Sequence, residues 1–126
     1  MSHEQMLRRA QPGIGPIVNF SGVWKNELGS KAVLEQDNMR LSGTYESAVS
    51  ADGHKTTGEL RGYVNGDLIS FVVHWREFQA ITAWVGQLLP GSSTALKTLW
   101  QMTSQVAPGE EWASINAGSD LFKRQP

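Results

Sequence analysis

The sequence contains no cysteine, which excludes disulfides, thiolate metal ligands and a cysteine nucleophile. It also lacks a long apolar run, because the longest one, residues 68–73, is far shorter than the roughly 20 residues that a membrane-spanning helix needs. Neither sign of charge is in excess, since 11 basic and 12 acidic side chains give a formal net charge of -1. Binding to a phosphate backbone is therefore not indicated, and we expect neither nucleic acid nor a membrane as a partner.

The first 18 residues show no apolar periodicity. They contain four residues that interrupt helices and strands: Pro12, Gly13, Gly15 and Pro16. We therefore expect a flexible N-terminal arm over residues 1–18 and a single domain over residues 19–126. No apolar segment follows the two arginines at positions 8 and 9, so this is not an intact secretory signal. Either the protein acts in the cytoplasm or a signal has been removed from it.

Hydrophobic residues make up 40% of the 126 residues, which is enough for the core of one compact domain. From Phe20 onward, short runs of β-branched and aromatic residues are separated by Gly, Asn, Asp and Pro, a pattern typical of strands and turns. The expected strands are 20–26, 31–36, 39–47, 57–64, 67–76, 79–89, 94–104 and 111–123, the last one bent or interrupted. No stretch keeps a 3.6-residue apolar period over three turns, so no long helix is expected.

Two turns are well marked. Asn65-Gly66 lies between two of the expected strands and predicts a two-residue type I′ hairpin, since both residues tolerate a positive φ. Leu89-Pro90-Gly91-Ser92 predicts a second turn. Eight short strands at this spacing favour an all-β fold, either an antiparallel up-and-down β-barrel or a sandwich. A barrel of eight strands is wide enough to hold one small ligand.

Alternation along the strands brings aromatic and hydrogen-bonding side chains onto the same faces. The shared faces hold Trp24, Asn26, Leu28 and Ser30; Tyr45 and Ser47; Ala80, Thr82 and Trp84; Thr98, Trp100 and Met102; and Asp120 with Phe122, while Trp75 ends the fifth strand. If these faces point inward, each polar group without a partner costs about 1–3 kcal/mol, so it must pair with another side chain, with water or with a ligand. Apolar walls with a few convergent polar groups are typical of a small-molecule pocket. Taken singly, each Ser or Thr is more often an exposed strand residue, and each alternating Trp is more often core.

Two other classes of function remain open on the residues alone. A lipocalin-like carrier of another, larger apolar ligand would need a mostly aliphatic lumen, whereas the lumen expected here carries six polar groups: Asn26, Ser30, Tyr45, Ser47, Thr82 and Asp120. An enzyme would need a general base beside its nucleophile, but His3 lies in the arm, His54 in a loop, and His74 beside inward-facing Trp75, so that it points outward. We therefore assign no catalytic residue and no metal ligand.

Five segments follow one another in a recognisable order. They are Trp24-Lys25-Asn26-Glu27-Leu28-Gly29-Ser30, Leu41-Ser42-Gly43-Thr44-Tyr45-Glu46-Ser47-Ala48-Val49, the set Trp75, Thr82 and Trp84, Leu99-Trp100-Gln101-Met102-Thr103-Ser104, and Trp112 with Asp120 and Phe122. Together they are similar to strand segments of the avidin/streptavidin family over residues 20–124. The resemblance implies an eight-stranded antiparallel up-and-down β-barrel that binds biotin with high affinity in its lumen, without covalent bonding or catalysis.

The resemblance also implies roles for single residues. The ureido oxygen of biotin would lie among Asn26, Ser30 and Tyr45, three donors that stabilise negative charge on it. Asp120 and Ser47 would accept the ureido N–H groups, and Thr82 would contact the sulfur. The remaining expected contacts are Trp75, Trp84 and Trp100 as walls, with Leu28, Val49, Ala80, Met102 and Trp112. Biotin would be the bound ligand, and no cofactor is expected.

Two departures and two further expectations accompany the resemblance. Ala80 stands where relatives place a Ser that contacts the ligand carboxylate, and the loop 48–57 differs from that of streptavidin. Trp112 matches a residue that crosses a subunit interface in tetrameric relatives, and Ile81, Ala83 and Val85 form an outward apolar row. A homotetramer is therefore expected, with a dimer as the alternative. The resemblance implies a secreted or periplasmic protein.

Overall fold

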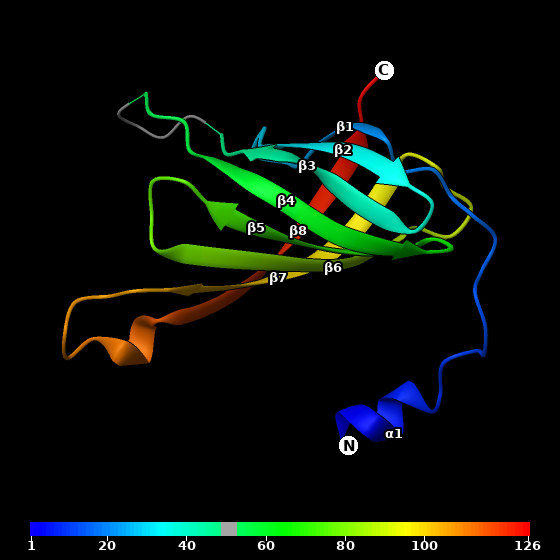
Figure 1. Ribbon diagram of the computed structural model, residues 1–126, viewed down its shortest axis with the longest axis horizontal. Coiled ribbons are helices and arrows are strands. Elements are labelled where there is room, and N and C mark those ends of the chain that lie inside the picture. The colour runs from blue at the N-terminus through cyan, green and yellow to red at the C-terminus, as the bar shows by residue number, and fades with distance from the viewer. Residues whose placement is uncertain (49–52) are drawn as a thin grey trace.

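Eight antiparallel strands close into a barrel in the computed structural model (Figure 1). The structure describes residues 1–48 and 53–126. The strands are β1 (Gly22–Lys25), β2 (Lys31–Asp37), β3 (Arg40–Glu46), β4 (Thr57–Asn65), β5 (Leu68–Trp75), β6 (Ala80–Leu88), β7 (Ala95–Ser104) and β8 (Ile115–Arg124). Each strand pairs with the next one along the chain, and β8 pairs with β1. The expected up-and-down barrel is confirmed, and closure excludes a sandwich. In the described part of the chain, no helix is long and apolar enough to cross a membrane.

The hairpin between β4 and β5 differs by one residue from the prediction. Asn65 pairs with Leu68, so the two turn residues are Gly66 and Asp67 rather than Asn65 and Gly66. Only Gly66 has a positive φ, of 61°, which suits a type II′ turn with glycine at its first central position. Asn65 thus stays in the strand, and its side-chain oxygen accepts the backbone N–H of Gly15 at 2.9 Å.

The N-terminal arm contains a short helix that the sequence analysis missed. Helix α1 spans His3–Leu7, and none of its residues is buried. Its N-terminus is a capping box, in which Ser2 Oγ accepts the N–H of Gln5 at 3.1 Å and Gln5 Oε1 accepts the N–H of Ser2 at 2.8 Å. The spacing Ser-x-x-Gln was a visible signal for this helix start. An apolar-period search overlooks it, because the helix packs against nothing.

The last strand begins later than expected. Residues Glu111–Ala113 form a 3-10 helix, η1, and β8 starts at Ile115 instead of residue 111. The chain has just turned at Gly109, which has a φ of 90°, and short-range bonds from Ala113 N–H to the Glu110 carbonyl at 2.9 Å hold the helical turn. Trp112 therefore lies in the β7–β8 connection, 84% exposed, and not on a strand face.

The two ends of the barrel are built differently. The β2–β3, β4–β5 and β6–β7 turns lie at one end, here called the closed end, and the β3–β4, β5–β6 and β7–β8 connections lie at the other, the open end (Figure 1). Inward side chains near the closed end are apolar and almost fully buried: Phe20, Leu34, Leu41, Val64, Ile69, Leu88 and Leu96. Two interactions hold the buried Trp24 side chain in this region. Its indole N–H donates to the Phe20 carbonyl at 2.9 Å, and the Arg124 guanidinium lies 4.4 Å from its ring centre.

An aromatic layer occupies the middle of the barrel. The Trp84 ring stacks between Phe71 and Tyr45, with ring centroids 5.2 and 4.7 Å apart, and Phe122 meets Trp84 edge-on at 6.5 Å. All four side chains are buried. This layer is the floor of the lumen, and of the buried polar residues Ser30 and Thr82 lie above it, while Thr98 lies below it and donates to the Asp120 carbonyl at 2.9 Å.

Candidate ligand-binding site

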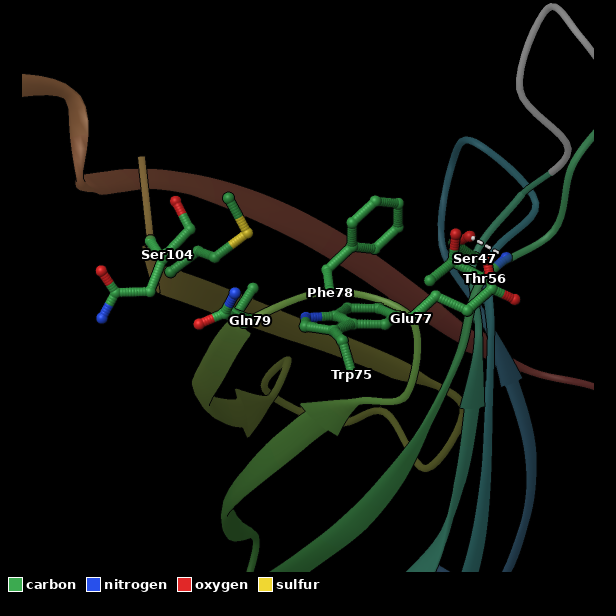
Figure 2. A pocket seen from close by; sticks show the side chains of 10 residues that line it. Ser47, Thr56, Trp75, Glu77, Phe78, Gln79 and Ser104 are labelled. Atoms are coloured by element: carbon green, nitrogen blue, oxygen red, sulfur yellow. Dashed lines mark hydrogen bonds between the residues drawn. The ribbon is translucent and has the colours of Figure 1, made fainter. Parts of the chain in front are cut away.

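A cavity of about 600 Å³ opens at the open end of the barrel (Figure 2). It is lined by Ser47, Thr56, Trp75, Glu77, Phe78, Gln79, Ala80, Met102, Ser104 and Gln105. These residues come from the β3–β4 loop, from the end of β5 through the β5–β6 loop to the start of β6, and from the end of β7 with the residue that follows it. Ser104 lies across the cavity from Ser47 and Thr56 in Figure 2. The volume suits a small molecule rather than a macromolecule.

Below the cavity, rows of inward side chains lead toward the aromatic floor. Register pairs Ala80 with Ser104, Thr82 with Met102, and Trp84 with Trp100. Successive rows are two residues apart on each strand, or about 7 Å. Trp100 has room because glycine stands opposite it on β8, where an added Cβ would lie 2.5 Å from the indole.

Indole N–H groups hold the polar side chains of these rows in place. Trp75 Nε1 donates to Thr82 Oγ1 at 2.9 Å, and Trp84 Nε1 donates to Asp120 Oδ2 at 2.9 Å. Thr82 is 3% exposed. Each acceptor keeps free lone pairs, because a hydroxyl and a carboxylate accept more than one hydrogen bond. Asp120 is thus a carboxylate in a mostly apolar lumen with capacity for a ligand donor.

The electrostatics of Asp120 involve a second carboxyl group, that of Glu27. Burial, and to a smaller extent the nearby charge of Glu27, raise the pKa of Asp120 above its ordinary value. Hydrogen bonds from backbone N–H groups lower the pKa of Glu27, and its Oε2 accepts the Leu121 N–H at 3.0 Å. The two carboxyls lie beside each other, and each affects the pKa of the other. Of the two, Asp120 is therefore the one that takes up a proton first as the pH falls.

The turn between β1 and β2 positions three further polar groups. Asn26 Oδ1 accepts the backbone N–H groups of Leu28 at 3.0 Å and Ser30 at 2.9 Å, so its amide N–H₂ group faces away from the turn, and it lies close enough to Asp120 to lower the pKa of that carboxyl. Ser30 Oγ accepts the Ala48 N–H at 2.8 Å and lies close to the Tyr45 hydroxyl. Burial raises the pKa of Tyr45 far above its usual range, so its hydroxyl stays protonated and remains a donor.

These contacts form one connected polar group inside the barrel. Within the described residues, no buried side-chain nitrogen or oxygen lacks a hydrogen-bond partner, so in the free chain the polar side chains satisfy one another. The described residues also hold no cluster of three or more His, Cys, Asp or Glu side chains that could bind a metal ion. The arrangement is that of a preorganised binding site for a small neutral group with both donors and acceptors.

The comparisons with known proteins agree with this geometry. The sequence profile of the Avidin family matches residues 16–125. The chain belongs to the avidin family. The structure of xenavidin is similar, with 31% sequence identity and a TM-score of 0.70 over 85% of this chain and 97% of that one. A biotin-binding protein from chicken shares 25% identity and a TM-score of 0.72 over 84% of this chain and 95% of that one.

Most of the avidin-family positions predicted from the sequence lie inside the barrel. Ser47, Trp75, Ala80 and Met102 line the cavity. Below it lie Asn26, Ser30, Tyr45, Thr82, Trp84, Trp100 and Asp120, all buried or half-buried. Strand alternation therefore predicted the inward faces of β3, β6, β7 and β8 correctly.

The other three predicted contacts are not among the interior residues that the structure describes. Leu28 does not share the inward face of Trp24, because β1 ends at Lys25 and Leu28 sits in the following turn, 74% exposed. Trp112 is exposed in the β7–β8 connection and does not line the cavity of its own chain. Val49 lies outside the described residues.

Sequence reasoning missed the residues that loops contribute. Glu27, which lies beside Asp120, was not predicted as a site residue. Six residues that line the cavity were not predicted either, five of them in loops and one at the end of β7: Thr56, Glu77, Phe78, Gln79, Gln105 and Ser104. Alternation says nothing about side chains beyond a strand end. The only sequence signal for Glu27 was its position directly after Asn26. Alternation predicts that a residue next to an inward one points outward, so this signal was overlooked.

Proposed function

We propose that this protein binds biotin non-covalently in the lumen of its barrel and catalyses no reaction. The observation that supports this most is the polar group of Asn26, Ser30, Tyr45 and Asp120 above an aromatic floor. It belongs to a chain of the avidin family, and a similar solved structure is a biotin-binding protein.

The chemistry of biotin suits these side chains. Its ureido carbonyl can accept from the Tyr45 hydroxyl, from the Ser30 hydroxyl and from the Asn26 amide, and such fixed donors stabilise charge on the oxygen. The two ureido N–H groups can donate to Ser47 and to the Asp120 carboxylate, the latter by a charge-assisted bond of roughly twice the usual strength.

The rest of the ligand would follow the rows of side chains outward. Thr82 lies at the level proposed for the sulfur, with the indoles of Trp75, Trp84 and Trp100 as walls. The apolar chain would pass Met102 and Ala80 into the cavity. Because the Thr82 hydroxyl already accepts from Trp75 at 2.9 Å, its own proton remains available to the ligand.

A binding role without catalysis agrees with the positions of the histidines. His3, His54 and His74 are all exposed, and none lines the cavity. A hydroxyl such as that of Ser30 or Ser47 is a weak nucleophile without a base beside it. The site would therefore hold its ligand unchanged.

Calorimetry with biotin tests this proposal directly. We expect one site per chain with a submicromolar Kd and a rise in melting temperature on adding biotin. A fatty acid of comparable size serves as the matched ligand for a lipocalin-like carrier. Absence of heat and of any thermal shift with saturating biotin would refute the proposal, and preferential binding of the fatty acid would replace it with the carrier function.

We further propose that the protein assembles as a homotetramer. The outer face of β5–β7 carries exposed apolar side chains, among them Val72, Ile81, Val85 and Leu99, and register places Val85 beside Leu99. A contiguous apolar patch on an outer surface commonly marks an interface. Trp112, which is 84% exposed, would contribute a large aromatic contact to the neighbouring subunit.

Light scattering tests the assembly. Four chain masses are expected for the unaltered protein, and a smaller species with faster biotin release is expected for Trp112→Lys. Val33→Lys, on the outer face of β2, is the matched control and should leave both quantities unchanged. A monomer in the unaltered protein would refute the tetramer while leaving the binding proposal intact.

A further inference from the structure

The cavity at the open end carries an unbalanced charge. Of its described lining residues, one is acidic, Glu77, and none is basic. Glu77 lies between Trp75 and Phe78 in the β5–β6 connection (Figure 2), and its side chain is 49% exposed. A ligand that leaves the barrel through this opening passes within the field of a carboxylate.

The nearest basic side chains do not remove this charge. Lys55 lies 3.0 Å from the carboxylate of Glu46 and is paired with it. Arg76 directly precedes Glu77 but does not line the cavity. His54 Nε2 lies 3.9 Å from Glu77 Oε2 and offsets the charge only when the imidazole is protonated.

The neutral side chains around Glu77 suit an uncharged group. Gln79, Ser104 and Gln105 line the same cavity, and their amides and hydroxyl can each donate and accept a hydrogen bond. An amide in the ligand has the same two capacities. Phe78, 60% exposed, offers an apolar surface to a methylene chain. A free carboxylate would find no charge-assisted donor among these groups.

The depth of the barrel determines that the end of the ligand chain lies near Glu77. Two row spacings, from Trp84 in the aromatic floor through Thr82 to Ala80 in the cavity lining, span about 14 Å at two residues a row. A bicyclic head held at Asp120 fills the lower rows, so the end of a short chain reaches the level of Ala80 and Glu77. Ala80 itself can offer no side-chain hydrogen bond.

We propose that the open end selects the conjugated form of the ligand: a biotin whose carboxyl has been converted to a neutral amide, as in biotin joined to a lysine side chain, over the free acid. Glu77 is the specificity-determining residue, because its charge repels the free carboxylate and leaves an amide unaffected. This inference rests on the proposed function, and it assigns to the site a ligand carried on another molecule.

The experiment compares free biotin with its N-methyl amide and methyl ester, using dissociation rates and Kd at pH 8 in low salt. For the unaltered protein we expect the two neutral forms to bind about fivefold more tightly than the acid, since exposed charge pairs contribute up to about 1 kcal/mol. The difference should shrink at high ionic strength, because salt screens exposed charges.

Two substitutions at Glu77 complete the test. Glu77→Gln should improve binding of the acid about fivefold and leave the amide and ester unchanged, and Glu77→Lys should make the acid the preferred form. Glu35→Gln, an exposed carboxylate on β2 away from the cavity, is the matched control and should alter none of these ratios.

The outcomes separate this inference from the proposed function. If none of the three ligands binds, the proposed function fails. If all bind but the unaltered protein holds the acid at least as tightly as the amide, or Glu77→Gln shifts all three ligands equally, the selectivity of the open end is refuted while biotin binding stands.

Discussion

The closed and open ends of this barrel use the same strands for opposite purposes. Along β3, the inward side chains change from Leu41 at the closed end to Tyr45 and then toward Ser47. Along β6, they change from Leu88 through Trp84 to Thr82. Within one strand, the inward side chains are aliphatic near the closed end, aromatic in the middle and hydroxyl-bearing toward the open end. The comparison indicates that folding stability comes mainly from one end and ligand recognition from the other, so that substitutions can separate them.

A cavity at the closed end should have the largest effect and should act on stability alone. Leu34 is 2% exposed and lies on β2 toward the closed end. Leu34→Ala should lower the free energy of unfolding by about 3 kcal/mol, in the range for buried leucine truncations. Urea denaturation measures this loss. The dissociation rate of biotin from the folded variant should stay within about twofold, because the register partners of Leu34 are Gly22 and Gly43 and not residues of the polar group.

Two other outcomes for Leu34→Ala would change this comparison of the closed and open ends. An equally large effect of Leu34→Ala on biotin release would mean that the two ends are coupled through the aromatic floor. An effect on unfolding below about 1 kcal/mol would mean that the closed end is not the main source of stability.

Removing the carboxylate at the open side of the floor should affect binding most. Asp120→Ala should speed biotin release by about 30-fold or more, since it removes a charge-assisted bond and leaves a ureido N–H without a partner. Thr82→Ala should have a smaller effect, about fivefold, because a neutral hydroxyl is lost. Stopped-flow displacement of labelled biotin measures both rates. Equal rates in the two variants would mean that Asp120 does not contact the ligand.

Crowding Trp100 should affect binding moderately. Gly118 faces Trp100 across β7 and β8, where an added Cβ would lie 2.5 Å from the indole. Gly118→Ala should therefore push the ring out of position and weaken biotin binding by about 1 kcal/mol, the lower limit for overpacking. The measurement is calorimetry with biotin. Gly91→Ala, in the β6–β7 turn, meets nothing within 4 Å and strains only its own positive φ of 73°, so as the control it should leave the affinity unchanged.

The smallest expected effect is a shift in pH dependence. Because the pKa of Asp120 is raised by burial and by Glu27, the folded ligand-free protein holds this proton more tightly than the unfolded chain. This term stabilises the fold at low pH, and the stabilisation is lost as pH rises through the raised pKa. Biotin binding should change in the opposite direction, since only ionised Asp120 accepts the ureido N–H without restriction.

Glu27→Gln tests this linkage. Removing the neighbouring charge should lower the pKa of Asp120, so both changes should move to lower pH while affinity at pH 7 stays nearly the same. Melting temperatures with and without biotin, taken between pH 3 and 7, report both changes at once. An unaltered pH profile would show that Glu27 does not influence Asp120.

The sequence by itself indicated an all-β domain, a barrel or a sandwich, and its resemblance to the avidin family then implied the barrel and most of its lining. Short runs of β-branched and aromatic residues between turn residues predicted eight strands, of which the first seven begin within two residues of the expected positions. Alternation predicted which side chains share a face. It also predicted the inward faces of Tyr45, Thr82, Trp84 and Asp120. This succeeded because the side-chain direction in a strand follows from position alone, with a period of two, and because one face of each strand must be buried.

Only the tertiary structure decided the positions of side chains outside the strands, because alternation does not apply to turns and loops. Glu27 meets the backbone of Leu121, 94 residues further along the chain, only because closure of the barrel places β8 beside β1. Leu28 does not lie on its expected face and Trp112 lies outside β8, because the β1–β2 turn and the 3-10 helix η1 break the two-residue period. The negative charge at the open end could not be predicted from alternation for the same reason, since Glu77 and Phe78 come from a loop. Loop side chains are placed by the strands that they connect, and that placement exists only after the barrel has closed.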